Sequence, residues 1–277
     1  MQKTMQDVYT SQLMRFGAPA RSREMSLAQA VRALEADEAD AIVMDVVPKH
    51  ELEAWWDDEG FSSSPFTKNA HHAGIVATSV TLGQLQREEG EQLVSKAAEY
   101  FGIASKVNEG LHRTRFVRLF AEALDAKPLT IGREYEVEFL LATRRVYEPF
   151  EAPFNFAPHC DDISYARDSA NWPMKRSYQR QLGGFLTIQG SANDAGMIVW
   201  NVQPPSRAKL DELHAEYAST GAMSELAHAA SIPLKPQPGQ LTLFQSKNLH
   251  AVERCTSTRR TMGLFLIHQE DGWRFFD

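Results

Sequence analysis

A succession of short apolar runs in the second half of the chain constrains the fold more than any other feature of the sequence. From about residue 133 these runs are rich in β-branched and aromatic residues, and Gly and Pro separate them. Many short strands joined by such turns are typical of a β-sandwich or barrel. A helix-like insertion at about 207–230 interrupts the series. The predicted strands are 135–143, 181–188, 196–202, 241–244 and 260–267.

Residues 1–130 have a different pattern and are predicted to be mainly helical. Residues 1–25 are polar and carry weak structural signals, and the Ser-, Thr-, Gly- and His-rich stretch 61–82 is predicted to be loop. The β-branched run 41–47 predicts a strand that ends before Pro48. Apolar residues at helical spacing predict the helices, one of them capped by Ser26. These helices are 26–35, 50–57, about 83–101 and about 105–124.

The two halves are expected to form a single catalytic domain over 1–277. Its core is 131–277, and the helices of 1–130 pack around that core. A chain of 277 residues is long enough to bury a substantial core.

Composition excludes several classes of function. The formal net charge of −7 argues against a broad nucleic-acid-binding surface. No run of eighteen apolar residues occurs, so no transmembrane helix is expected. Cys160 and Cys255 are the only cysteines. This number argues against a disulfide framework and fits a reducing, cytoplasmic location. The expected partner is a small anionic molecule, with a homodimer as one option.

His159, Asp161 and His250 form the candidate metal site. His159 and Asp161 are two residues apart, so both side chains point to the same face of an extended strand. His250 would complete a face of two histidines and one carboxylate, which leaves the opposite coordination positions open. Taken singly, each histidine is more often an ordinary, partly buried residue than a ligand. The surrounding strands favour the metal site.

An arginine pair follows the second histidine at the head of the last predicted strand. Arg259 lies nine residues after His250, and Arg260 follows it. An arginine at this place can hold a carboxylate through two parallel hydrogen bonds. H-x-D, a distant His and then this Arg resemble the iron(II)/2-oxoglutarate-dependent dioxygenases. Over roughly 130–277, and above all in 236–244 and 259–266, the chain resembles the N-substituted (N-succinyl) L-amino acid β-hydroxylases and the related free-standing alkaloid halogenases.

The resemblance implies a mainly β fold with added helices, in which the core is a double-stranded β-helix (a cupin-like jelly roll). It implies Fe(II) held by His159, Asp161 and His250, with 2-oxoglutarate and O2 as cosubstrates. An arginine of the last core strand would bind the far carboxylate of 2-oxoglutarate. The family pattern Arg-x-Ser/Thr favours Arg259, which shares a strand face with Thr261, and Arg260 is the alternative.

The resemblance also implies the reaction. Related halogenases have Gly or Ala at the position of Asp161, which opens a coordination site for chloride. Asp161 fills that site, so hydroxylation of an unactivated C–H bond is expected, with release of succinate and CO2. The expected substrate is small and acidic, and the expected position is the β-carbon of an N-succinyl L-amino acid. The residues expected to bind this substrate are Gly83, Arg87, Arg167, Arg207 and Phe265.

Two other interpretations of the sequence remain open. One is a jelly-roll binding protein that has no turnover. The other is an oxygenase of the same fold that acts on a different small molecule or on a peptide. Arg144 and Arg145 form a further basic pair, placed on a strand, and they are expected to have structural roles.

Overall fold

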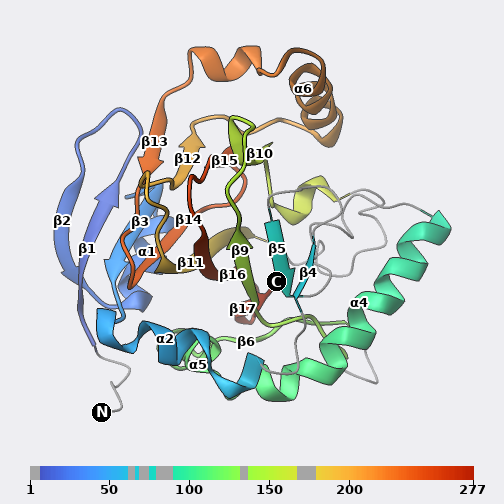
Figure 1. The fold of residues 1–277 in the computed structure, drawn as a ribbon. Coiled ribbons are helices and arrows are strands. Elements are labelled where there is room, and N and C mark those ends of the chain that lie inside the picture. The colour runs from blue at the N-terminus through green and yellow to red at the C-terminus, as the bar shows by residue number, and fades with distance from the viewer. Residues whose placement is uncertain (1–6, 62–65, 69–74, 79–89, 132–136, 167–178) are drawn as a thin grey trace.

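Two antiparallel sheets face each other in the computed structural model, which describes residues 7–61, 66–68, 75–78, 90–131, 137–166 and 179–277 (Figure 1). From β9 to β16 the chain passes back and forth between the sheets, which is the connection pattern of a double-stranded β-helix. The predicted jelly-roll core is therefore confirmed. One sheet contains β9 (Thr143–Tyr147), β11 (Arg180–Gln189), β14 (Gln240–Gln245) and β16 (Arg259–Gln269), and the other contains β10 (Phe154–His159), β12 (Met197–Trp200), β13 (Ser231–Leu234) and β15 (His250–Glu253).

The larger sheet has strands from the N-terminal part of the chain at both of its ends. Its order is β2-β1-β3-β14-β11-β16-β9-β5-β4, so the predicted strand β3 joins the core directly. The prediction that 61–82 is loop was wrong, because strands lie within it, and strands also lie within 1–25, for which no element was predicted. The strands that the N-terminal part adds to this sheet are β1 (Tyr9–Met14), β2 (Arg21–Met25), the predicted β3 (Ala41–Asp45), β4 (Phe66–Lys68) and β5 (Ile75–Thr78).

The helices lie outside the two sheets, as predicted in outline. Residues 105–124 are not one helix, because Thr114 caps a new helix after a turn. The insertion at 207–230 is helical, and it lies beyond the smaller sheet at the top of Figure 1. No described helix has a stretch long and apolar enough to span a membrane. The helices are α1 (Leu27–Glu35), α2 (Leu52–Trp56), α4 (Gly90–Leu111), α5 (Arg115–Leu124) and α6 (Arg207–Thr220), with 3-10 turns η1 (Lys49–Glu51), η2 (Glu59–Phe61), η3 (Ile163–Tyr165) and η6 (Ser224–Ala227).

The prediction of one continuous strand over 135–143 was wrong. Phe139–Ala142 is buried but is not a strand. Its apolar side chains belong to the core cluster that also contains residues of α4. The Phe139 ring, for example, lies 5.1 Å from that of Phe101. The true core strand β9 begins at Thr143. The remaining short strands are β6 (Lys127–Pro128), β7 (Thr130–Ile131), β8 (Val137–Glu138) and β17 (Gly272–Phe276).

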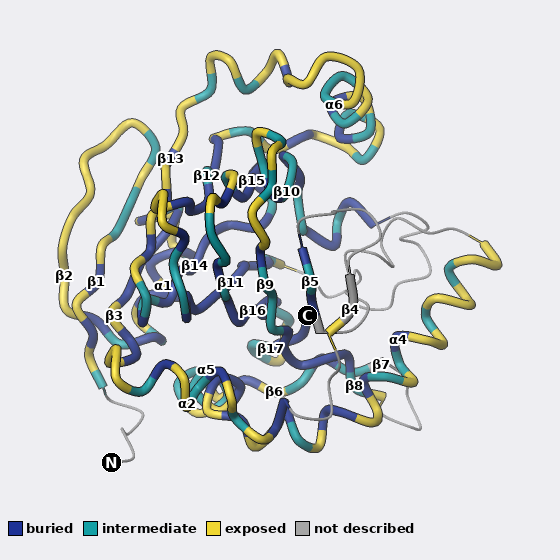
Figure 2. The backbone as a smooth tube through the Cα atoms, viewed as in Figure 1, coloured by how far each residue is buried: buried dark blue, intermediate teal, exposed yellow. Residues whose placement is uncertain are grey.

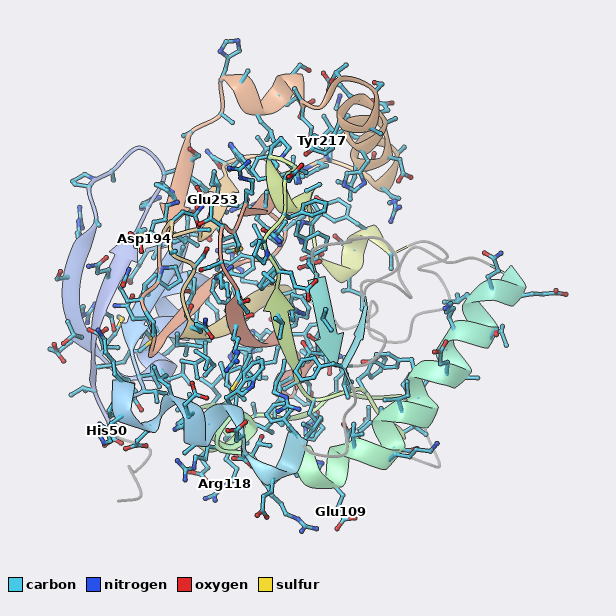
Figure 3. The ribbon with its side chains drawn as sticks, viewed as in Figure 1. His50, Glu109, Arg118, Asp194, Tyr217 and Glu253 are labelled. Atoms are coloured by element: carbon cyan, nitrogen blue, oxygen red, sulfur yellow. The ribbon has the colours of Figure 1, made fainter. Side chains whose placement is uncertain are left out.

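Alternation along the strands of the larger sheet separates the helix-packing core from the interior of the jelly roll. Leu182 and Leu186 of β11 belong to the large core cluster that includes α1, α4 and α5, whereas Phe185 belongs to a cluster between the two sheets. Figure 2 shows the core strands buried and the outer faces of the helices exposed. On those outer faces Arg118 of α5 pairs with Glu122 at 2.7 Å (Figure 3), and such an exposed pair stabilises the fold little.

Two glycines of α4 provide a test of this packing. A Cβ on Gly110 would lie 2.6 Å from the carbonyl oxygen of Gly60, whereas a Cβ on Gly102 would meet nothing within 4 Å. Gly102→Ala is expected to raise the free energy of unfolding by about 0.5–1 kcal/mol, because alanine favours a helix. Gly110→Ala is expected to lower it by about 1–3 kcal/mol through overpacking. Urea denaturation measures both changes, and equal effects at the two sites would contradict the packing.

Candidate metal centre

His159, Asp161 and His250 come together at one end of the jelly roll. His159 is the last residue of β10 and His250 the first of β15, and the two are paired directly across these strands. Asp161 follows β10 by two residues, and its Oδ2 lies 3.5 Å from His159 Nε2 and 3.3 Å from His250 Nε2. The candidate ligand atoms all lie within 4.8 Å of one another. This donor set suits a divalent transition metal and leaves coordination positions open.

The backbone orients both imidazoles. His159 Nδ1 lies 2.7 Å from the carbonyl oxygen of Ala157, and His250 Nδ1 lies 2.8 Å from that of Asn248. A carbonyl oxygen only accepts hydrogen bonds, so each Nδ1 carries the proton and each Nε2 has a free lone pair toward Asp161. The Phe156 ring stacks on the His159 ring with 3.7 Å between the centroids, which further fixes that imidazole.

The protonation states also suit a metal. Burial and the neighbouring His250 lower the pKa of His159, so its imidazole is neutral at pH 7. Burial alone would raise the pKa of the Asp161 carboxyl, but contacts with His159 and His250 outweigh burial and hold the pKa well below its usual range. Neutral imidazole and ionised carboxylate are the forms that bind a metal ion.

Hydrogen bonds hold the Asp161 backbone in place, and its two chain neighbours have other partners. The Asp161 amide donates to the Ser246 carbonyl at 3.2 Å, and Gln181 Nε2 donates to the Asp161 carbonyl at 2.6 Å. Asp162 accepts a hydrogen bond from the Ser164 amide at 2.9 Å and so caps η3. The Cys160 thiol points instead to the Lys247 carbonyl at 3.3 Å, as the alternation of an extended strand predicts.

A pocket opens from the metal site between the two sheets. About 470 Å³ of space not filled by protein atoms lies in this pocket and its open mouth. Most of its wall is apolar, and Phe265 is part of it, as predicted. The polar residues of the wall are the three candidate ligands together with Arg145, Tyr147 and Arg259.

Arg259, and not Arg260, lines this pocket. Its side chain is buried, with the guanidinium 5.2 Å from the ring centre of Tyr147 and 5.4 Å from that of Phe185. Its Nη2 is buried and has no hydrogen-bond partner among the described residues. A buried cation with an unsatisfied donor needs an anion, so the residues present fit a carboxylate ligand. Burial also lowers the pKa of Arg259.

Arg260 and Thr261 occupy the positions that strand alternation gives them. Arg260 is on the opposite face of β16, where its guanidinium lies 5.5 Å from the ring centre of Trp56 and 3.7 Å from the Glu53 carboxylate. This placement rules out contact between Arg260 and the pocket described here. Thr261 is buried on the face of Arg259, but the pocket wall does not include it.

Arg207 is the one further predicted substrate contact that the described part of the chain contains. Arg207 begins α6, donates to the Tyr165 carbonyl at 2.9 Å and pairs with Asp211 at 2.8 Å. It does not line the pocket, and its contact with substrate stays a prediction. Gly83, Arg87 and Arg167 lie outside the described residues.

Sequence reasoning missed Arg145 and Tyr147, which both line the pocket from β9. The predicted strand ended at residue 143, so Tyr147 was not considered, and Arg145 was given a structural role. If the strand is extended over Thr143–Tyr147, alternation places Thr143, Arg145 and Tyr147 on one face and Arg144 on the other. The structure bears this out, because the Arg144 guanidinium lies outside the pocket, 5.0 Å from the ring centre of Phe61.

Comparison with solved structures gives two full-length matches. A crystal structure of an N-substituted L-amino acid dioxygenase from Burkholderia ambifaria AMMD is 71% identical, covers 98% of this chain and 100% of its own, and has a TM-score of 0.88. A structure of such a dioxygenase from the same organism in complex with alpha-KG is 69% identical, with the same coverage and a TM-score of 0.87. No family model matches the chain. The search of curated proteins likewise finds no match.

Proposed function

Because the chain belongs to the family of N-substituted L-amino acid dioxygenases, which depend on 2-oxoglutarate, we propose that it hydroxylates an unactivated C–H bond of a small, anionic N-substituted L-amino acid. The β-carbon of an N-succinyl amino acid is the proposed position. The convergence of His159, Asp161 and His250 at the base of a largely apolar pocket carries the proposal.

We propose roles for the residues of the pocket. His159, Asp161 and His250 would hold Fe(II), and Arg259 would bind the far carboxylate of 2-oxoglutarate. When bound, the metal and 2-oxoglutarate supply the oxidation of a C–H bond by O2, with release of succinate and CO2. Asp161 supports hydroxylation over halogenation because its carboxylate takes the coordination position that chloride would need.

The pocket's apolar wall has a separate role in the proposal. Phe185, Phe244 and Phe265 line the space next to the metal site. Their rings would exclude water from the reacting carbon and restrict how the substrate can lie. Phe244 also contacts His250, with 4.9 Å between the ring centroids, so it joins the wall to the metal site. No general base among the side chains is required for this reaction.

A substrate screen tests the proposal. With Fe(II) and 2-oxoglutarate present, N-succinyl and other N-acyl L-amino acids are expected to produce succinate and a hydroxylated product, whereas the free amino acids are not. Succinate assay and mass spectrometry of the product measure both. Turnover of free amino acids or peptides alone would contradict the proposed substrate but not the reaction. Absence of succinate with every compound would favour a binding protein without turnover.

A further inference from the structure

Arg145 presents a cation to the pocket that the proposed roles above do not use. It lies on β9, opposite Thr261 of β16, and its side chain is 23% exposed while that of its partner Asp277 is 0% exposed. Arg145 Nη2 donates to Asp277 Oδ1 at 2.7 Å. Because the carboxylate is fully buried and the guanidinium reaches the pocket wall, the pair directs its positive end toward the pocket.

Asp277 is fixed on several sides. Its Oδ1 also accepts a hydrogen bond from Thr143 Oγ1 at 2.8 Å. Its amide donates to the Leu140 carbonyl at 2.6 Å, and its carbonyl accepts a hydrogen bond from the Tyr100 hydroxyl of α4. A carboxylate held in this way fixes the direction of the guanidinium that it binds. Arg145 is thus oriented before any ligand arrives, which lowers the entropy cost of binding.

Gly263 makes room for the guanidinium. It lies on β16 beside Arg145, and its backbone is not in the left-handed region that would by itself favour glycine. A Cβ at this position would lie 3.1 Å from Arg145 Nη1 and 3.5 Å from its Cζ. The absence of a side chain at 263 is therefore explained by the space that Arg145 occupies.

The guanidinium retains donors for a ligand. An arginine has five N–H groups. Arg145 donates to Asp277 and contacts the Tyr147 side chain, and its charge also interacts with the Asp161 carboxylate across the pocket. Tyr147 also contacts the Arg259 guanidinium through its ring, so it lies between the two cations of the pocket. Two arginines in one pocket fit ligands with more than one carboxylate.

We propose that Arg145 is a second carboxylate anchor in this pocket and that Asp277 is its positioning residue. The inference rests on the proposed function, in which the cosubstrate and the substrate both carry carboxylates. The carboxylate comes either from the metal-side end of 2-oxoglutarate or from the amino-acid substrate. The chemistry of recognition is the same in both cases, and the two sources are separated by binding measurements.

Arg145→Gln tests the anchor, because it keeps a polar side chain and removes the charge. Under anaerobic conditions with Fe(II), 2-oxoglutarate is titrated against the metal-to-ligand charge-transfer band, and N-succinyl-L-leucine is then titrated against the change in that band. One of the two dissociation constants is expected to rise about 10- to 100-fold, as for a lost charge-assisted hydrogen bond. The ligand whose constant rises is the one whose carboxylate Arg145 binds. Both constants within twofold of wild type would overturn the anchor. The wild-type band is the control for the proposed function, because its absence would overturn both proposals together.

Asp277→Asn tests the positioning role. The same dissociation constant is expected to rise, but less than with Arg145→Gln, and the double variant is expected to bind no more weakly than Arg145→Gln alone. Losses that add in the double variant would overturn the positioning role. Asp271→Asn is the matched control, because Asp271 is an exposed partner of Arg274 outside the pocket, and it is expected to bind as wild type.

Gly263→Ala keeps every charge and gives an independent test if Asp277→Asn does not fold. The added methyl group crowds Arg145 Nη1, so the guanidinium must shift by a few tenths of an ångström. Binding of the ligand that Arg145→Gln affects is expected to weaken here as well, but less. Unchanged binding of both ligands by a folded Gly263→Ala variant would contradict the placement of the anchor.

Discussion

Replacing His159 by alanine is expected to abolish iron(II) binding and turnover together. The variant leaves one imidazole and one carboxylate, which cannot complete the three-ligand face that the structure assembles. Loss even of an outer-shell partner typically costs about 10- to 100-fold in metal affinity or activity, so loss of a ligand is expected to cost more than about 100-fold. Equilibrium dialysis of Fe(II) and a succinate assay measure the two effects.

His50→Ala is the control for this variant. His50 is exposed, lies next to Glu51 at the lower left of Figure 3 and is not part of the pocket wall. It is expected to bind iron and to turn over as wild type does. If His159→Ala kept wild-type iron affinity and succinate formation, the assignment of the metal site would be wrong.

Replacing Arg259 by leucine is expected to raise the KM for 2-oxoglutarate strongly. Removal of one partner of a buried, hydrogen-bonded charge pair costs about 2–5 kcal/mol, which is about 30- to 5000-fold in binding. The protein without ligand is expected to be at least as stable as wild type, because leucine replaces a buried cation whose Nη2 has no hydrogen-bond partner among the described residues. Steady-state kinetics with varied 2-oxoglutarate measures the KM, and thermal denaturation without 2-oxoglutarate measures the stability.

Arg260→Gln is the matched control, since its guanidinium lies on the opposite face beside Glu53. Its KM for 2-oxoglutarate is expected to be unchanged. The assignment would be contradicted if Arg260→Gln raised this KM and Arg259→Leu did not. A pair of adjacent arginines thus tests whether strand alternation has been assigned correctly.

The strands of the core could be predicted because both sheets bury them. β11, β14 and β16 are apolar on both faces, since helices cover one face and the second sheet covers the other. β2 was missed because it is the edge strand of the larger sheet, and its first four residues are exposed. An edge strand with two solvated faces has no hydrophobic alternation from which it could be predicted.

The metal site could also be predicted from the sequence, but the rest of the pocket only in part. The spacing of His159 and Asp161 indicated a shared face, and the family resemblance made it a metal site. Strand parity separated Arg259 from Arg260, and the family pattern Arg-x-Ser/Thr then favoured Arg259. Arg145 was expected to have a structural role. The apolar run Phe139–Ala142, which packs against a helix, gave no sign that the core strand begins only at Thr143. The contact between Arg145 and Asp277 joins residues that are 132 positions apart, so no local sequence pattern could predict it.

Labelling with ¹⁸O2 tests the central claim most directly. If the chain is a 2-oxoglutarate-dependent hydroxylase of an N-substituted L-amino acid, one labelled oxygen atom is expected in succinate and one in the hydroxylated product, with one succinate formed for each product. Mass spectrometry of both compounds measures this in a single reaction. A product that forms without the label, a chlorinated product in chloride buffer, or succinate that is unlabelled would contradict the account.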